Sequence, residues 1–286
     1  MIKTEKLIYG ALNSDQKFEG SISYDDSIST PRPGILVCHA YGGHSPFDIS
    51  KAEKLAELGY FAFAIDLYGQ GRRGSNPEES MALMNEFNSD RVLLQERMIN
   101  AFETLKNFDQ VDKNKTGAIG FCFGGKCALD LARSGEDIKG VVSFHGLYDT
   151  PTASTGKQLK GTLKIDSSIL ILHGYDDPMA TPKSMIELAD GFVVLSGGIG
   201  TWEEFFEVLV GRLLGEHDGP IGVLRDGPMN DALLELIERG TNLGFVRPVT
   251  QDLVQVHEDP KQLLDAMLAS ESNAVDDADL RPGARS

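Results

Sequence analysis

The chain has 286 residues, of which 41% are apolar and 24% are charged, the balance of a folded globular protein rather than a disordered one. Its 43 acidic residues outnumber its 27 basic residues and give a formal net charge of −16, which argues against nucleic acid and anionic membranes as main partners. A small anionic ligand stays compatible with this charge, because local backbone dipoles can override it.

Short apolar runs alternate along the chain with longer amphipathic stretches, and this rhythm predicts a three-layer α/β/α fold with a mostly parallel sheet. The expected strands are Gly34–His39, Tyr60–Ile65, Thr116–Gly120, Gly140–Phe144, Ser168–His173, Gly191–Leu195, Pro220–Leu224 and Leu253–Val256. The expected helices are Phe47–Leu58, Glu78–Asn107, Gly124–Arg133, Pro182–Leu188, Thr201–Leu214, Met229–Arg239 and Pro260–Ala269. Residues 271–286 are acidic and poor in apolar residues, which predicts a disordered tail.

The cysteines and the amino-terminal residues bear on the cellular compartment in which the protein is expected. Cys38, Cys122 and Cys127 are an odd and sparse set rather than a disulfide framework, which fits a reducing environment. The first residues lead into no apolar core of signal-peptide length, and the longest apolar stretch, Tyr60–Ile65, is too short to cross a bilayer. We therefore expect a cytoplasmic protein.

The sequence Gly-Phe-Cys-Phe-Gly-Gly at 120–125 follows an expected strand and opens an expected helix. A G-x-nucleophile-x-G turn of this kind places one side chain, here Cys122, at the apex of a tight strand-to-helix corner. The amide of Phe123 would then point into an oxyanion hole, and the positive end of the helix would favour a thiolate. The alternative is a buried cysteine in a glycine-rich turn, and we expect Cys38 and Cys127 to be core residues of that kind.

Two further segments fit the same chemistry. His39–Gly43 follows an early strand, where an α/β-hydrolase supplies its second oxyanion amide, here that of Tyr41. His173–Pro178 follows a later strand in the position of the acid loop, and the HGxxD spacing selects Asp177 over Asp176 as the acid. The order of nucleophile before acid fits that fold, whereas a structural turn or cap is the alternative role for both aspartates.

The amino-terminal two thirds of the chain resemble the dienelactone hydrolase family of α/β-hydrolases. The motifs that carry the resemblance are Gly120–Gly125, Ile65–Gly69 and His173–Pro178. The resemblance implies an α/β-hydrolase core that hydrolyses small cyclic esters (lactones) with a Cys-His-Asp triad and without a metal or organic cofactor. It also implies a substrate-binding arginine near Arg72 or Arg73, for which a solvated surface pair is the alternative.

The same resemblance places the triad histidine in a loop after one further strand, Gly191–Leu195, which can fill the eighth position of the hydrolase sheet. The loop that follows contains glycines, a threonine and two glutamates but no histidine. Four of the six histidines lack the chain order of the triad: His39, His44, His145 and His173. Only His217 and His257 come late enough, at distances unlike those of the family. We therefore expect impaired hydrolysis, because removing one triad member costs several powers of ten in rate, on the order of 10⁴.

Residues 189–268 resemble a different family, the cytokinin-activating phosphoribohydrolases (Lonely guy), long mislabelled as lysine decarboxylases. Their PGGxGTxxE signature reads SGGIGTWEE at 196–204, with serine in place of the leading proline. The resemblance implies cleavage of ribose 5-phosphate from a nucleoside monophosphate, with Glu204 as the catalytic carboxylate. The positions that it implies for phosphate binding and catalysis are Gly197, Gly198, Gly200, Thr201 and Glu204. The alternative is a capping box, with Thr201 as the N-cap residue and Glu204 three residues later.

Neither segment supplies the complete site of its parent family. We interpret the chain as a fused or recombined protein, with a hydrolase portion at 1–190, a Rossmann-like portion at 191–270 and a tail at 271–286. The expected activity is hydrolysis of a small ester or lactone through Cys122. The alternatives are a nucleoside 5′-monophosphate phosphoribohydrolase and an inactive chimeric scaffold. No cofactor and no metal is expected, and the oligomeric state stays open.

Overall fold

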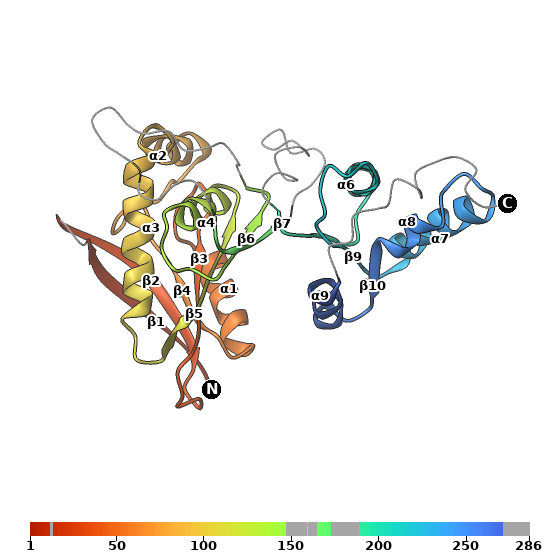
Figure 1. The fold of residues 1–286 in the computed structure, drawn as a ribbon. Helices are drawn as coiled ribbons and strands as arrows, with labels where there is room; N and C mark the ends of the chain where they lie inside the picture. Colours follow the sequence, from red (N-terminus) through yellow and green to blue (C-terminus); the bar gives the residue numbers. More distant parts are fainter. Residues whose placement is uncertain (12–13, 147–158, 160–164, 173–188, 271–286) are drawn as a thin grey trace. The chain divides into compact units, whose positions relative to one another are not determined.

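The computed structural model describes residues 1–11, 14–146, 159, 165–172 and 189–270, and it divides into two compact units, Met1–Ile169 and Leu170–Ser286. Each unit has a sheet (Figure 1). Each unit also contains buried hydrophobic residues that form a core. The division between the units falls within strand β7, earlier in the chain than the predicted division at 190, which stays a prediction.

The first unit is built on a seven-stranded sheet with the order β1-β2-β4-β3-β5-β6-β7. Its strands are β1 (Ile2–Ala11), β2 (Ser14–Asp25), β3 (Arg32–Cys38), β4 (Phe61–Ala64), β5 (Val111–Phe121), β6 (Gly140–Phe144) and β7 (Ser168–Leu172). β1 and β2 form an antiparallel pair that the sequence did not predict, and β2 also pairs antiparallel with β4. The pairs from β4 through β3 and β5 to β6 are parallel, which confirms the predicted fold class.

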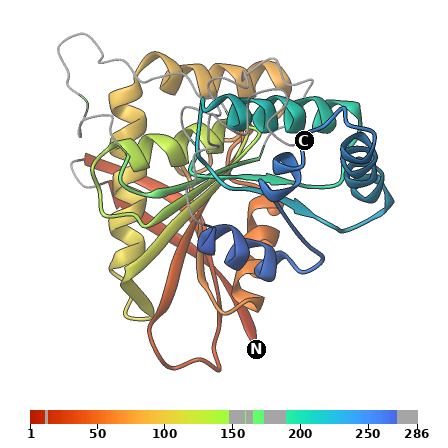
Figure 2. The same cartoon turned by 45° about the vertical axis from the view of Figure 1, so that its right-hand side comes forward.

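Helices cover both faces of this sheet (Figures 1 and 2). They are α1 (Pro46–Glu57), α2 (Pro77–Ser89), α3 (Arg91–Lys106) and α4 (Phe123–Arg133). Because side chains alternate along a strand, β3 sends Val37 to one face and Gly34 to the other. Val37 packs with Ala52 of α1, whereas a Cβ at Gly34 would meet Leu105 of α3. α4 packs beside α3, so the first unit has the predicted three layers.

The break between α2 and α3 corrects the prediction of one helix over Glu78–Asn107. Asp90 leaves helical geometry, with φ −129° and ψ 82°, and its carboxylate accepts the amide of Leu93 at 3.0 Å. This side chain caps the amino terminus of α3 and thereby starts a new helix. Asn76 caps α2 in the same way by accepting the amide of Glu79 at 2.9 Å.

The second unit is built on a parallel three-stranded sheet with the order β10-β9-β8. Its elements are β8 (Phe192–Val194), α6 (Ile199–Leu214), β9 (Ile221–Leu224), α7 (Pro228–Asn242), α8 (Val249–Asp252), β10 (Val254–His257) and α9 (Pro260–Ala269). Since β8 pairs with β9, the strand that was expected to fill the eighth position of the hydrolase sheet belongs to this second sheet.

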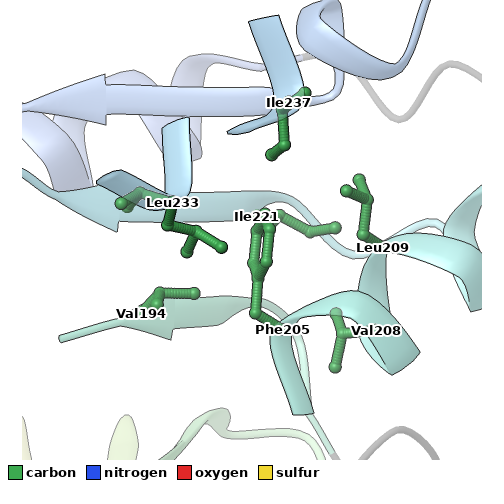
Figure 3. Packing of buried hydrophobic residues seen from close by; sticks show 8 residues of the cluster. Val194, Phe205, Val208, Leu209, Ile221, Leu233 and Ile237 are labelled. Atoms are coloured by element: carbon green, nitrogen blue, oxygen red, sulfur yellow. The ribbon is translucent and has the colours of Figure 1, made fainter. Parts of the chain in front are cut away.

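The core of the second unit gathers around Phe205 of α6, which lies among side chains from β8, β9 and α7 (Figure 3). Ile221 and Val223 of β9 belong to this cluster, together with Leu233 of α7. Gly222, between them in the strand, faces the opposite side, where a Cβ would overlap α9. Two helices therefore cover one face of this sheet and α9 covers the other.

Some predictions fall outside the described residues. These are the end of the strand at His173, the helix Pro182–Leu188 and the tail 271–286. Within the described part of the chain, no helix is both long enough and apolar enough to cross a membrane.

Candidate active site

Cys122 is the single residue between the end of β5 and the start of α4, at a tight corner of the backbone. Its φ of 56° and ψ of −118° lie outside the regions that side-chain-bearing residues ordinarily adopt. The corner is held from both sides, because the Cys122 amide donates to the Phe144 carbonyl at 2.9 Å and the Gly125 amide donates to the Cys122 carbonyl at 3.0 Å. A strained residue at a strand-to-helix corner is the geometry of a nucleophile elbow.

The glycines around Cys122 allow the strand and the helix to approach closely. A Cβ at Gly120 would overlap the backbone at Gly124, and a Cβ at Gly124 would overlap the Cys38 carbonyl. A Cβ at Gly125 would overlap the Ser143 hydroxyl on β6. The three glycines of the motif are therefore required by packing as well as by the turn.

The two residues predicted to form the oxyanion hole lie at the same edge of the sheet. Phe123 is the first residue of α4, and Tyr41 follows the end of β3. β3 and β5 are neighbours whose register pairs Cys38 with Gly120, so both loops leave the carboxyl end of the sheet. Tyr68 links them: its hydroxyl donates to the Tyr41 carbonyl at 2.8 Å, and its ring centroid lies 6.2 Å from that of Phe123.

A buried carboxylate organises the loop that carries Tyr68. Asp66 accepts the amides of Tyr68 and Gly69 at 3.0 and 3.1 Å, and Arg73 approaches the same oxygen at 3.3 Å. Asp66 and Tyr68 both lie inside the Ile65–Gly69 motif, but the sequence alone does not assign these roles to them. The signal in the sequence that could have identified them is their position directly after the expected strand Tyr60–Ile65.

The two arginines considered for substrate binding both have protein partners. The Arg73 guanidinium donates to the His44 carbonyl at 2.6 Å as well as to Asp66. Arg72 is partly exposed and forms a 2.6 Å ion pair with Glu86. Arg73 therefore braces the loop after β4, and Arg72 fits the alternative of a surface residue.

Both ring nitrogens of His39 form hydrogen bonds with neighbouring backbone groups. Its Nδ1 donates to the Ala40 carbonyl at 2.7 Å, and its Nε2 accepts the Leu67 amide at 3.2 Å. Burial lowers the pKa of His39 to about 4, so the ring is neutral near pH 7. Burial likewise lowers the pKa of His44 to about 4. The two hydrogen bonds to the backbone make His39 a structural histidine.

The remaining triad candidates lie in the second unit or outside the described residues. His217 donates through Nε2 to the Val208 carbonyl at 2.8 Å, a contact within the second unit. His257 ends β10. Asp177, the predicted acid, and His173 lie outside the described residues, so the acid assignment stays a prediction.

The glycine-rich turn of the second unit lies after β8. The N-cap residue of α6 is Gly198, so Gly200 and Thr201 lie in the first turn of the helix. The capping-box alternative is therefore wrong, because Thr201 is inside the helix and caps nothing. A Cβ at Gly197 would overlap the Thr201 side chain. Beside this turn lies a cavity of about 230 Å³, whose lining includes Thr201 and Glu204.

Polar side chains meet behind the same turn. Ser196, after β8, hydrogen-bonds to Asp226, which follows β9. Asn230 in the first turn of α7 is fully buried and donates to the Leu224 carbonyl at 2.6 Å. These contacts join the loops after two neighbouring strands. In the described part of the chain, no group of three or more His, Cys, Asp or Glu side chains is arranged to hold a metal ion.

The model of the family described as "Dienelactone hydrolase family" matches residues 18–194, which is more than half of the chain. The chain belongs to the dienelactone hydrolase family. The solved structure titled "m3DLH" is 30% identical, with a TM-score of 0.57 over 64% of this chain and 73% of that one. A dienelactone hydrolase-like promiscuous phosphotriesterase, P91 from metagenomic libraries, is 28% identical, with a TM-score of 0.56 over 72% of this chain and 77% of that one.

The carboxyl-terminal part of this dienelactone hydrolase family member matches a second family model, "Possible lysine decarboxylase", over residues 168–267. Cytokinin riboside 5′-monophosphate phosphoribohydrolase of Rhodococcoides fascians is 42% identical over 88 residues, which are 31% of this chain and 44% of that protein. A probable enzyme of the same name from Oryza sativa subsp. japonica is 35% identical over 83 residues, 29% of this chain and 34% of that protein. The chain thus spans less than half of either relative. Both predicted resemblances are confirmed.

Proposed function

We propose that the chain hydrolyses small esters or lactones through a cysteine nucleophile. In this proposal Cys122 attacks the substrate, Asp177 is the acid of the site, and the amides of Phe123 and Tyr41 stabilise the oxyanion. The observation that carries the proposal is the positive φ of Cys122 between β5 and α4, because a strained backbone at that corner serves to expose a nucleophile.

The chemistry needs no group beyond the chain and water. The Cys122 thiolate forms a bond to the carbonyl carbon, the ester C–O bond breaks, and the alcohol leaves after taking up a proton. Water then adds to the thioester carbon, and the thiol leaves as the carboxylic acid is released. Both tetrahedral intermediates carry charge on oxygen, which amides at a helix amino terminus stabilise.

We further propose that turnover is slow compared with that of an enzyme with a complete triad. No histidine lies between residues 178 and 216, where the family resemblance places the triad histidine. Without a histidine held by the acid of the triad, an activated ester can still acylate the thiol, whereas hydrolysis of the thioester becomes limiting.

The test is hydrolysis of p-nitrophenyl acetate by the full chain and by Cys122→Ala. We expect the steady-state rate of the full chain above the uncatalysed background to be lost in Cys122→Ala, because the thioester can no longer form. Cys127→Ala is the matched control, because Cys127 is buried in α4 and has no role in the proposal. Equal rates for the full chain and Cys122→Ala would overturn the proposed function.

A second candidate function rests on the turn at Gly197–Thr201 and the adjoining cavity. We infer that a nucleoside 5′-monophosphate would place its phosphate on the amides of this turn, with Glu204 beside the ribose. Isothermal calorimetry with adenosine monophosphate tests the binding, and adenine release tests the reaction. We expect Glu204→Gln to retain binding and to abolish release. An absence of binding to the full chain would remove this candidate.

The third interpretation is a chimeric scaffold in which neither site turns over. It follows from the proposal that the portions 1–190 and 191–270 derive from different families and were joined by recombination. This interpretation stands if both assays fail while the chain still unfolds cooperatively.

A further inference from the structure

A second strained residue lies next to Cys122 in the fold. Among the described residues other than glycine, only Cys122 and His145 have a positive φ, 56° and 45°. Cys122 follows β5, and His145 follows β6, which is the neighbouring parallel strand. Histidine is one of the few residue types enriched in this conformation, and such residues cluster at active sites.

The register of the sheet makes the two residues neighbours. Phe121 of β5 pairs with Phe144 of β6, and their rings stack with centroids 4.6 Å apart. The next residues along the two strands are Cys122 and His145. The Cys122 amide donates to the Phe144 carbonyl at 2.9 Å, and that carbonyl belongs to the peptide bond that leads into His145. Neighbouring strands are separated by roughly 4.8 Å, which an imidazole spans.

Among the described residues, the titratable side chains near this corner include Tyr68, whose ring lies 6.2 Å from that of Phe123, and Lys51 of α1. Burial raises the pKa of Tyr68, so its phenol stays neutral when the thiol ionises. The Lys51 ammonium lies 5.9 Å from the Phe121 ring and over the ring of Phe47. Cys122 is partly buried, whereas His145 is exposed to solvent. An exposed imidazole can exchange its proton with water between steps.

Resting on the proposed thiol chemistry, we propose that His145 is the proton acceptor for Cys122, in place of the histidine missing from the triad order. The imidazole takes the thiol proton as the sulfur attacks the ester carbon, and it returns that proton to the departing alkoxide. In the second half, it takes a proton from the attacking water and gives it to the departing thiolate. Atoms and charge balance in both halves with water as the co-reactant.

The test is the pH dependence of Cys122 alkylation by iodoacetamide, followed by peptide mass spectrometry of the full chain. His145→Asn is the variant of choice, because asparagine also tolerates positive φ and the fold is retained. We expect the midpoint of the rate profile to rise by about one pH unit in His145→Asn, which lowers the rate at pH 7 about tenfold. His257→Asn in the second unit is the control and keeps the profile of the full chain.

The outcomes separate the two proposals. If the full chain alkylates Cys122 with a low midpoint and His145→Asn leaves that midpoint unchanged, His145 is not the acceptor and the nucleophile assignment survives. If Cys122 of the full chain reacts only as an ordinary thiol does, with a midpoint near pH 8.5 in both proteins, His145 has no influence on the thiol and the present inference is overturned. Failure of the nucleophile itself is recognised separately, by the unchanged ester hydrolysis of Cys122→Ala.

Discussion

The two units place glycine-rich turns at equivalent points, directly after a parallel strand and before a helix, but they use glycine differently. In the first unit a residue with a side chain, Cys122, has a positive φ. The neighbouring glycines allow the strand and the helix to pack closely around it. In the second unit the N-cap residue is Gly198 itself, in an extended conformation, so the turn presents backbone amides. The first arrangement suits a nucleophile and the second suits an anion.

This difference predicts that replacing a glycine by alanine destabilises the turn of the first unit much more than the turn of the second unit. Gly124→Ala would drive a Cβ into the Cys38 carbonyl, and we expect a loss of about 3 kcal/mol or more in the free energy of unfolding. Gly198→Ala meets no heavy atom within 4 Å and has φ −95°, so we expect a change within about 1 kcal/mol. Urea unfolding followed by circular dichroism measures both. Equal destabilisation by the two substitutions would break the comparison.

A buried histidine gives the first unit a sensitivity to acid. The folded pKa of His39 is about 4, below that of an unfolded histidine, so the unfolded chain binds more protons between these values. Stability is therefore lost as the pH falls, by about 2 kcal/mol between pH 7 and pH 5. His39→Gln can keep both hydrogen bonds without titrating, and its stability should depend less on pH. If the free energy of unfolding of His39→Gln falls with pH as steeply as that of the full chain, His39 is not the cause of the acid sensitivity.

Tyr68 tests whether the link between the two loops matters for the first unit's site. Tyr68→Phe removes the hydrogen bond to the Tyr41 carbonyl and should cost about 1 kcal/mol of stability. We also expect ester hydrolysis to fall roughly tenfold, less than the loss caused by deleting an oxyanion donor outright. The matched control is Thr241→Val, which removes a 2.9 Å bond to the Ile237 carbonyl in α7 of the second unit. If both variants leave hydrolysis unchanged, Tyr68 does not position the loop.

The central strands β4 and β9 were predictable because they are short, continuous apolar runs that are buried on both faces. The β1–β2 pair was not predictable, since Tyr9 is the one buried residue of β1 and the remaining residues of that strand give little apolar alternation. The single helix predicted over Glu78–Asn107 was wrong because its apolar period continues across Asp90. Only the capping side chain of that aspartate marks the break.

The corner at Cys122 was predictable from its glycines, and the nearness of His145 was not. The Gly120–Gly125 motif specifies a local turn, whereas the position of His145 depends on which strand lies next to β5. Strand order is a property of the whole sheet, and the distance along the chain between the two residues carries no information about it. The same holds for Tyr68, whose contact with Tyr41 joins loops after two different strands.

Identification of the residue that an activated ester modifies tests the role of Cys122 directly. The full chain is mixed briefly with p-nitrophenyl acetate, quenched in acid and digested, and the acetylated peptide is sequenced by mass spectrometry. We predict a burst of p-nitrophenolate together with an acetyl thioester on Cys122. Acetyl groups confined to lysines or to other cysteines, with Cys122 unmodified, would contradict it.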